Sequence, residues 1–135
     1  MYGRSMANLV TVSMSLELLD SIFEGARQLY PKETILMLRG KKSKDAIRIT
    51  DLIIPPLATY GHGSASYPFH LLPVDFTLIG TVHSHPSGNK TPSDVDLNNF
   101  FGRVMMIVGY PYKTEQDVVA YNCNGEKVPI QVTKE

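Results

Sequence analysis

Residues 76–96 have the sequence FTLIGTVHSHPSGNKTPSDVD, which predicts a strand joined to a helix by a loop. The apolar, β-branched run Phe76–Val82 predicts a strand, and it leads directly into His83-Ser84-His85-Pro86, where proline ends the strand. After a loop, Ser93 supplies an N-cap for a short helix that we expect to extend to Phe101. The segment therefore predicts polar side chains gathered where a strand ends and a helix begins.

The flanking sequence predicts one long helix and several further strands. Between Ser13 and Tyr30, apolar residues recur every three or four positions, which is the spacing of one helix face, and Pro31 ends the pattern. The glycine- and proline-rich stretch Leu57–Pro73 predicts a long surface loop. The predicted strands are Glu33–Leu38, Ala46–Ile54, Val104–Val108, Asp117–Tyr121 and Lys127–Val132. This order predicts an α/β (α+β) sandwich in which helices flank a mixed, largely antiparallel sheet.

The composition is that of an ordinary globular protein. The 135 residues are 43% hydrophobic and 19% charged, which fits a single domain spanning residues 1–135. Thirteen Lys and Arg balance thirteen Asp and Glu, so the chain lacks the basic excess typical of nucleic-acid-binding proteins. No apolar stretch is long enough to span a membrane, residues 1–8 lack the apolar middle of a signal peptide, and Cys123 is the single cysteine. We therefore expect a cytoplasmic protein with neither nucleic-acid nor membrane partners.

Two histidines and an aspartate are candidates for a metal site. His83 and His85 are two positions apart, so a strand directs both imidazoles to one side and Ser84 to the other. Asp96 follows eleven residues after His85, across a turn-rich stretch that is long enough to fold back over the histidines. Two nitrogens and one carboxylate oxygen leave the fourth tetrahedral position of zinc for water, which is typical of catalytic zinc.

Glu33 and Ser93 are the candidate catalytic residues beside this metal. Glu33 stands alone at the start of an apolar strand, where it could take a proton from water and pass it to a leaving amine. Ser93 could donate its hydroxyl to the oxyanion formed when water attacks a carbonyl. Each feature also has a structural explanation, because most histidines bind no metal, Ser93-x-x-Asp96 forms a helix capping box, and Glu33 fits a charged strand end. Their joint occurrence favours a hydrolase.

The spacing of these residues resembles a family signature. His83-Ser84-His85-Pro86, six residues, Ser93, two residues and Asp96 match the H-x-H-P-x6-S-x-x-D pattern of the JAMM (MPN+) zinc metalloproteases. Glu33 stands at the place of their upstream glutamate, and a predicted helix precedes it, as in that family. The likeness covers about residues 12–132 and is closest to the small stand-alone archaeal members.

The resemblance implies a cytidine-deaminase-like fold and a role for each residue. It implies that His83, His85 and Asp96 bind one zinc ion per chain. It also implies that Glu33 deprotonates the zinc-bound water and that Ser93 steadies the tetrahedral intermediate. With all of these residues present, nothing in the sequence indicates an inactive member of the family.

The activity implied by the resemblance is that of a zinc isopeptidase similar to deubiquitinases. Such an enzyme hydrolyses the bond between the C-terminal glycine of a ubiquitin-like modifier and a lysine side chain. We expect the modifier tail to add as a strand beside an exposed sheet edge, with Leu57–Pro73 as a flanking wall. Leu36 departs from many members, which have glycine there, and we interpret it as a packing variation.

Other functions fit the same residues. The same chemistry could trim an amino acid from the C-terminus of a ubiquitin-like sulfur carrier. The domain could instead be a non-catalytic scaffold, although the intact Glu33 argues against this. It could also be an RNA or DNA enzyme that uses the same metal as a Lewis acid, although the balanced charge argues against a phosphate substrate. His62 and His70 are expected to face solvent or line the cleft, and Cys123 to have a structural role. The oligomeric state, including a homodimer, stays open.

Overall fold

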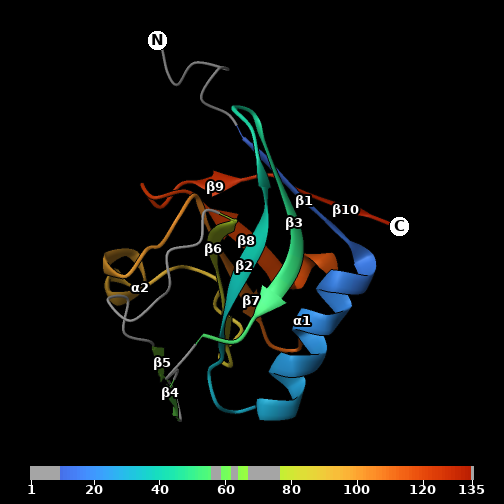
Figure 1. Cartoon of the computed structure of the whole chain (residues 1–135). Helices are drawn as coiled ribbons and strands as arrows, with labels where there is room; N and C mark the ends of the chain where they lie inside the picture. The colour runs from blue at the N-terminus through green and yellow to red at the C-terminus, as the bar shows by residue number, and fades with distance from the viewer. Residues whose placement is uncertain (1–9, 56–58, 62–63, 67–76, 135) are drawn as a thin grey trace.

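A mixed β-sheet forms the centre of the protein, as the computed structural model in Figure 1 shows. The structure describes residues 10–55, 59–61, 64–66 and 77–134, so His62, His70 and most of the expected loop Leu57–Pro73 lie outside the described residues. The strands are β1 (Thr11–Ser15), β2 (Ile35–Lys42), β3 (Ala46–Ile53), β4 (Thr59–Gly61), β5 (Ser64–Ser66), β6 (Leu78–His85), β7 (Val104–Gly109), β8 (Val118–Tyr121), β9 (Lys127–Val128) and β10 (Ile130–Thr133). The helices are α1 (Leu16–Leu29) and α2 (Asp94–Asn98), with a 3-10 turn at Glu115–Asp117.

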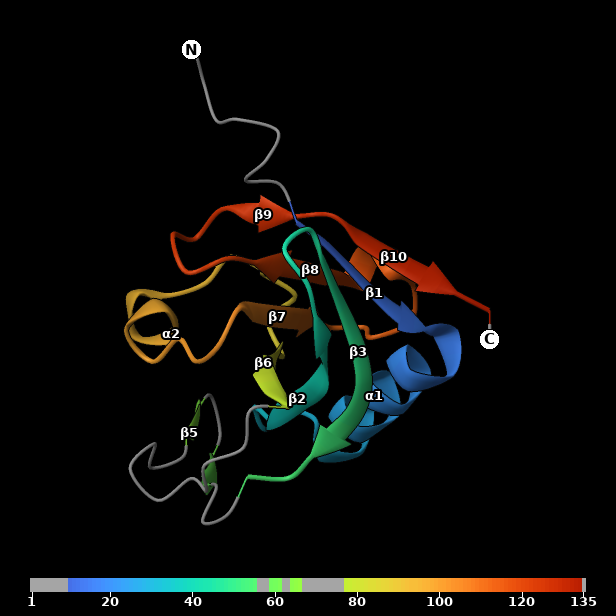
Figure 2. The ribbon, with the colours of Figure 1, turned by 45° about the horizontal axis from the view of Figure 1, so that its top comes forward.

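The main sheet has eight strands in the order β10-β1-β3-β2-β6-β7-β8-β9, and β4 pairs with β5 in a separate small sheet. The pairs β10·β1, β1·β3 and β6·β7 are parallel, and the other four pairs are antiparallel. The two edge strands, β9 and β10, are separated in the chain by Pro129 alone, so the sheet curls until its edges meet (Figure 2). This architecture confirms the predicted mixed α+β fold.

The amphipathic helix α1 covers one face of the sheet. Ser15 caps it by accepting a hydrogen bond from the Leu18 N–H at 3.1 Å. Its buried stripe packs on the main hydrophobic cluster of the sheet and consists of Leu19, Ile22, Phe23 and Ala26. Figures 1 and 2 show α1 and α2 on opposite sides of the sheet. Among the described residues, no helix is both long enough and apolar enough to cross a membrane.

The predicted start of the long helix at Ser13 was wrong. Residues Thr11–Ser15 form β1, which pairs in parallel with both β3 and β10. The segment alternates buried Val12 and Met14 with more exposed neighbours, as a strand does. Its partners lie far away in the chain, so long-range pairing decides its conformation and the local pattern does not.

Several other boundaries differ from the prediction, and the short helix expected to extend to Phe101 ends at Asn98. The strand expected to begin at Glu33 begins at Ile35 and continues through Gly40 to Lys42. Gly40 is needed there because a Cβ atom would lie 2.0 Å from the Arg48 carbonyl oxygen. The last expected strand divides into β9 and β10 at Pro129, whose nitrogen has no hydrogen to donate to a ladder.

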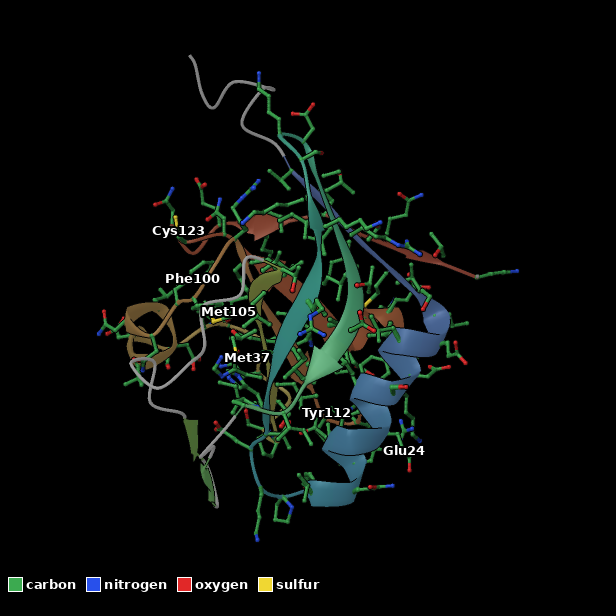
Figure 3. The ribbon with its side chains drawn as sticks, viewed as in Figure 1. Glu24, Met37, Phe100, Met105, Tyr112 and Cys123 are labelled. Carbon is green, nitrogen blue, oxygen red and sulfur yellow. The ribbon has the colours of Figure 1, made fainter. Side chains whose placement is uncertain are left out.

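The face of the sheet opposite α1 carries the first histidine. Ile35, His83 and Ile107 pair across β2, β6 and β7, so their side chains share this face. All three are buried. Met37 and Met105 lie two positions further along on the same face, and Figure 3 shows both on the side of the sheet toward α2. Apolar side chains on this face of the sheet therefore surround His83, the predicted metal ligand.

Truncating Phe23, on the buried face of α1 that packs against the sheet, should destabilise the whole fold. Phe23 is 2% exposed, so Phe23→Ala removes a buried ring and leaves a cavity, and we expect a loss of about 3–5 kcal/mol in the free energy of unfolding. Urea unfolding at neutral pH measures this loss. Leu29→Ala is the control, because Leu29 lies on the same helix but is 42% exposed. Equal losses in the two variants would contradict the assigned packing.

Candidate metal centre

His83 and His85 lie at the carboxyl end of β6. His83 is 6% exposed, and His85 is half-buried. The Nδ1 atom of His85 lies 2.8 Å from the carbonyl oxygen of Asn89. Because a carbonyl oxygen only accepts, Nδ1 carries a hydrogen, and in the neutral ring Nε2 then has the lone pair. Metal-binding imidazoles are commonly oriented in this way by a backbone carbonyl.

The start of α2 holds the Asp96 carboxylate beside both imidazoles. Ser93 Oγ accepts from the Asp96 N–H at 3.0 Å, and Asp96 Oδ2 accepts from the Ser93 N–H at 2.9 Å. Asp96 Oδ2 also lies 3.4 Å from His85 Nε2, and Oδ1 lies 3.8 Å from His83 Nδ1. The capping box considered as an alternative explanation is therefore present, and it fixes the carboxylate next to the histidines.

The distances from Asp96 to the two histidines are close to those of a tetrahedral zinc site. Ligand atoms at zinc-binding distance and tetrahedral angles lie about 3.4 Å from one another. The His85–Asp96 distance equals this value, and the His83–Asp96 distance is slightly longer. Within the described ranges, no group of three or more His, Cys, Asp or Glu side chains is arranged to hold a metal ion, so binding would require these side chains to move. The donor set of two nitrogens and one oxygen suits zinc.

Glu33 lies opposite His85 in the strand register continued beyond the start of β2. Ile35 pairs with His83, and the Ser84 N–H donates to the Thr34 carbonyl at 3.1 Å, so the antiparallel pairing sets Glu33 against His85. Burial raises the pKa of the half-buried Glu33 carboxyl, His85 acts to lower it, and the charge of Asp96 raises it further. Both His85 and Asp96 therefore act electrostatically on the Glu33 carboxyl.

Burial and Asp96 together set the charges of the two histidines. Burial lowers the pKa of His83 to about 4, although Asp96 acts in the opposite direction. Burial also lowers the pKa of His85, but Asp96, Glu33 and a backbone carbonyl outweigh it and raise the pKa overall. Burial alone would raise the pKa of Asp96, yet its hydrogen bonds and the nearby imidazoles lower it to about 2. At neutral pH, His83 is neutral and Asp96 is ionised, which are the states that metal binding needs.

Ser93 is exposed at the N-terminus of α2, where it is the N-cap. The capping hydrogen bond uses a lone pair of its oxygen and leaves the hydroxyl hydrogen available as a donor. Capping a helix and donating to an oxyanion are therefore compatible roles for this side chain.

Two supporting groups were not predicted from the sequence. The Asn89 carbonyl that orients His85 depends on the conformation of the loop, for which no residue type gives a signal. Alternation predicted that Ser84 points away from the histidines, but nothing identified Thr34 as its partner. The five residues that were predicted do lie together at this end of the sheet; they are Glu33, His83, His85, Ser93 and Asp96.

The sequence is similar to known metalloprotease-like proteins. The family described as prokaryotic homologs of the JAB domain, Prok-JAB, matches residues 15–124. A probable metalloprotease from Haloferax volcanii is 35% identical over 128 residues, which cover 90% of this chain and 79% of that protein.

The fold is similar to several solved structures. A JAB1/MPN domain protein from Archaeoglobus fulgidus has a TM-score of 0.67 and 37% identity, with 90% of this chain and 99% of that chain covered. A structure described as a metalloprotease-like JAMM zinc site in the proteasome and signalosome has a TM-score of 0.65 and 32% identity, with 93% and 99% covered. A protein from Desulfitobacterium hafniense shares the fold with a TM-score of 0.67 at 16% identity, with 92% and 94% covered.

The metal-free protein should lose stability in acid through His83. The His83 pKa is about 4 in the fold against 6.5 for the unperturbed side chain, so the unfolded chain binds more protons between these values. The free energy of unfolding should therefore fall as the pH drops from 6.5 to 4, by an amount on the order of 3 kcal/mol. Urea unfolding of chelator-treated protein at several pH values measures this loss.

Two variants separate the histidines. His83→Gln cannot titrate, so it should flatten the pH dependence in this window. His85, whose pKa is raised, contributes stability that is lost as the pH rises, so His85→Gln should keep the acid loss. An unchanged pH dependence in His83→Gln would contradict a buried, neutral His83.

Proposed function

Because the chain belongs to the Prok-JAB family of prokaryotic JAB-domain homologs, we propose that it is a zinc-dependent peptidase of the JAMM type, acting as an isopeptidase. Family membership confirms the resemblance noted in the sequence. The proposed substrate bond joins the C-terminal glycine of a ubiquitin-like modifier to a lysine ε-amine. The observation that supports this most is the convergence of His83, His85 and Asp96 with Glu33 beside them.

His83, His85 and Asp96 are the residues that would hold the metal. When bound, zinc supplies Lewis acidity, which polarises a carbonyl and makes water a stronger nucleophile near neutral pH. The neutral imidazole of His83 and the ionised Asp96 need no proton release before binding. One ion per chain is proposed, because these three side chains make up the ligand set of a single catalytic zinc ion.

Glu33 is proposed as the group that moves the proton. Its carboxylate takes a proton from the attacking water and returns it to the leaving amine. The raised pKa of Glu33 supports this role, because it brings the carboxyl closer to the range where it both accepts and donates near neutral pH. Its position opposite His85 keeps it at the same end of the sheet as the metal ligands.

Ser93 is proposed to stabilise the oxyanion. The hydroxyl hydrogen left free by the capping box donates to the negative oxygen that forms when water adds to the carbonyl. The short helix holds the serine in place before substrate arrives, so little reorganisation is needed when charge develops.

The extended tail of the modifier needs a strand partner near the site. β6 is paired on both sides, by β2 and β7, so the tail cannot add to the strand that carries the histidines. The separate β4–β5 sheet lies on the same side of the main sheet as α2 in both views (Figures 1 and 2). We assign the tail to an edge of this small sheet, which falls within the predicted flanking segment Leu57–Pro73.

The choice of substrate is tested by a paired cleavage assay. The purified protein is incubated with a lysine-linked conjugate of a ubiquitin-like protein of its host, and with the same protein extended by one amino acid. We expect chelator-sensitive release of the modifier from the lysine conjugate, at least about tenfold faster than trimming of the extended protein.

The reverse preference would identify a C-terminal trimming peptidase for a ubiquitin-like carrier. Cleavage of neither substrate with zinc bound would instead support a non-catalytic scaffold. A mobility-shift assay at low salt checks the expected lack of nucleic-acid binding.

Glu33→Gln should keep zinc but abolish hydrolysis. The amide cannot accept a proton, so we expect kcat to fall by about 10²–10⁴-fold, while elemental analysis still finds one zinc per chain. Glu24→Gln is the matched control, because it makes the same chemical change on the exposed side of α1, away from the site (Figure 3). Unchanged turnover in Glu33→Gln would refute the assigned role.

His85→Ala provides the comparison that separates proton transfer from metal binding. Loss of this ligand should remove both zinc and activity. Cys123→Ser should affect neither, because Cys123 is an exposed free thiol in the turn after β8, at the other end of the sheet (Figure 3). A free thiol also fits the reducing cytosol that we propose as the compartment. Full zinc content in His85→Ala would show that the ligand set is wrong.

A further inference from the structure

Two buried hydroxyl groups lie directly behind the candidate metal centre. Ser84 stands between the two histidines on β6, and its side chain points to the α1 face. Ser84 is 0% exposed, and its partner Thr34 is 9% exposed. Neither side chain faces the proposed substrate side, so the roles assigned to Glu33, His83 and His85 leave both unexplained.

Three hydrogen bonds join these two residues. The Ser84 N–H donates to the Thr34 carbonyl at 3.1 Å, the Thr34 N–H donates to Ser84 Oγ at 2.8 Å, and the Thr34 hydroxyl donates to Ser84 Oγ at 3.0 Å. The Ser84 hydroxyl thus takes the place of a carbonyl as the acceptor for the Thr34 amide. This hydrogen bond continues the pairing with β6 to Thr34, one residue before the regular strand β2 begins at Ile35.

The residue held at the end of this attachment is Glu33. Thr34 and Ser84 occupy one position of the antiparallel register, and the next position sets Glu33 opposite His85. Since β2 starts only at Ile35, Glu33 lacks the support of a regular ladder. The Ser84–Thr34 hydrogen bonds therefore constrain the backbone after the proposed base, while the Lys32 N–H, which donates to the Leu29 carbonyl at 2.8 Å, constrains the backbone before it.

We propose that Ser84 is a positioning residue that acts through Thr34 to hold the Glu33 carboxylate opposite His85. This inference rests on the proposed function, in which Glu33 transfers the proton. Without the Ser84 hydroxyl, the Thr34 amide is left buried with no acceptor, and this favours displacement of the segment toward water. A shift of about 1 Å at a catalytic group is enough to reduce turnover by about 100-fold.

Tyr112 provides a matched control for the loss of a buried hydroxyl in the same region. It is 0% exposed, and its hydroxyl has no hydrogen-bond partner among the described residues. Burial raises the Tyr112 pKa, and Ser84 lowers it in part. Tyr112→Phe removes a hydroxyl beside Ser84 and leaves the bonds to Thr34 in place.

The test compares Ser84→Ala, Ser84→Thr and Tyr112→Phe with the wild-type zinc-loaded protein, well below their melting temperatures. For Ser84→Ala we expect an unchanged zinc content, a KM within about twofold of wild type, and a kcat lower by about 10–100-fold. Ser84→Thr keeps the hydroxyl and should restore kcat, and Tyr112→Phe should leave it unchanged. If Ser84→Ala does not fold, Ser84→Cys retains a weak acceptor of similar size and should show a smaller loss of kcat.

A second readout is independent of catalysis. Amide hydrogen exchange, followed by NMR on the metal-free protein, should be at least about tenfold faster at Thr34 in Ser84→Ala, while the amides of β1 keep their protection. Wild-type kcat together with wild-type exchange at Thr34 in this variant would overturn the positioning role. A wild-type protein that hydrolyses no conjugate would overturn the proposed function instead, so the two failures are distinguishable.

Discussion

The antiparallel register between β2 and β6 is the constraint on which the site depends. Ile35 pairs with His83, and the same register, continued by two residues, sets Glu33 opposite His85. Because side chains alternate along a strand, a slip of one residue would turn the carboxylate to the α1 face and separate it from the imidazoles. On its other side β6 packs closely against β7, since a Cβ atom at Gly80 would lie 2.0 Å from the Val104 carbonyl oxygen.

The polar groups around this register serve the fold and the site together. Asp96 is both a member of the capping box of α2 and the carboxylate nearest to the histidines. Its interactions keep it ionised, while burial keeps His83 neutral. The elements that fold this end of the sheet thus also fix the protonation states on which a metal site depends.

The parts predicted from the sequence are those that local patterns determine. The α1 stripe follows from apolar spacing, and the His83-x-His85 alternation and the Ser93–Asp96 spacing are likewise short-range. β1 was missed because its conformation depends on β3 and β10, which are distant in the chain. Glu33 was chosen as the candidate base because it stands alone at the start of an apolar strand, and the family resemblance supported the choice, but only the fold brings its strand beside β6. The Asn89 carbonyl and the Thr34–Ser84 pair depend on backbone geometry that side-chain identity does not encode.

We propose that three side chains from β6 and α2 share one metal ion beside Glu33. An anomalous difference map at the zinc edge, from crystals of the zinc-loaded protein, tests it most directly. We expect one strong peak within about 2.0–2.2 Å of a nitrogen of His83, a nitrogen of His85 and an oxygen of Asp96, with the Glu33 carboxylate facing the remaining position. A peak bound elsewhere, or one that lacks Asp96 as a ligand, would contradict it.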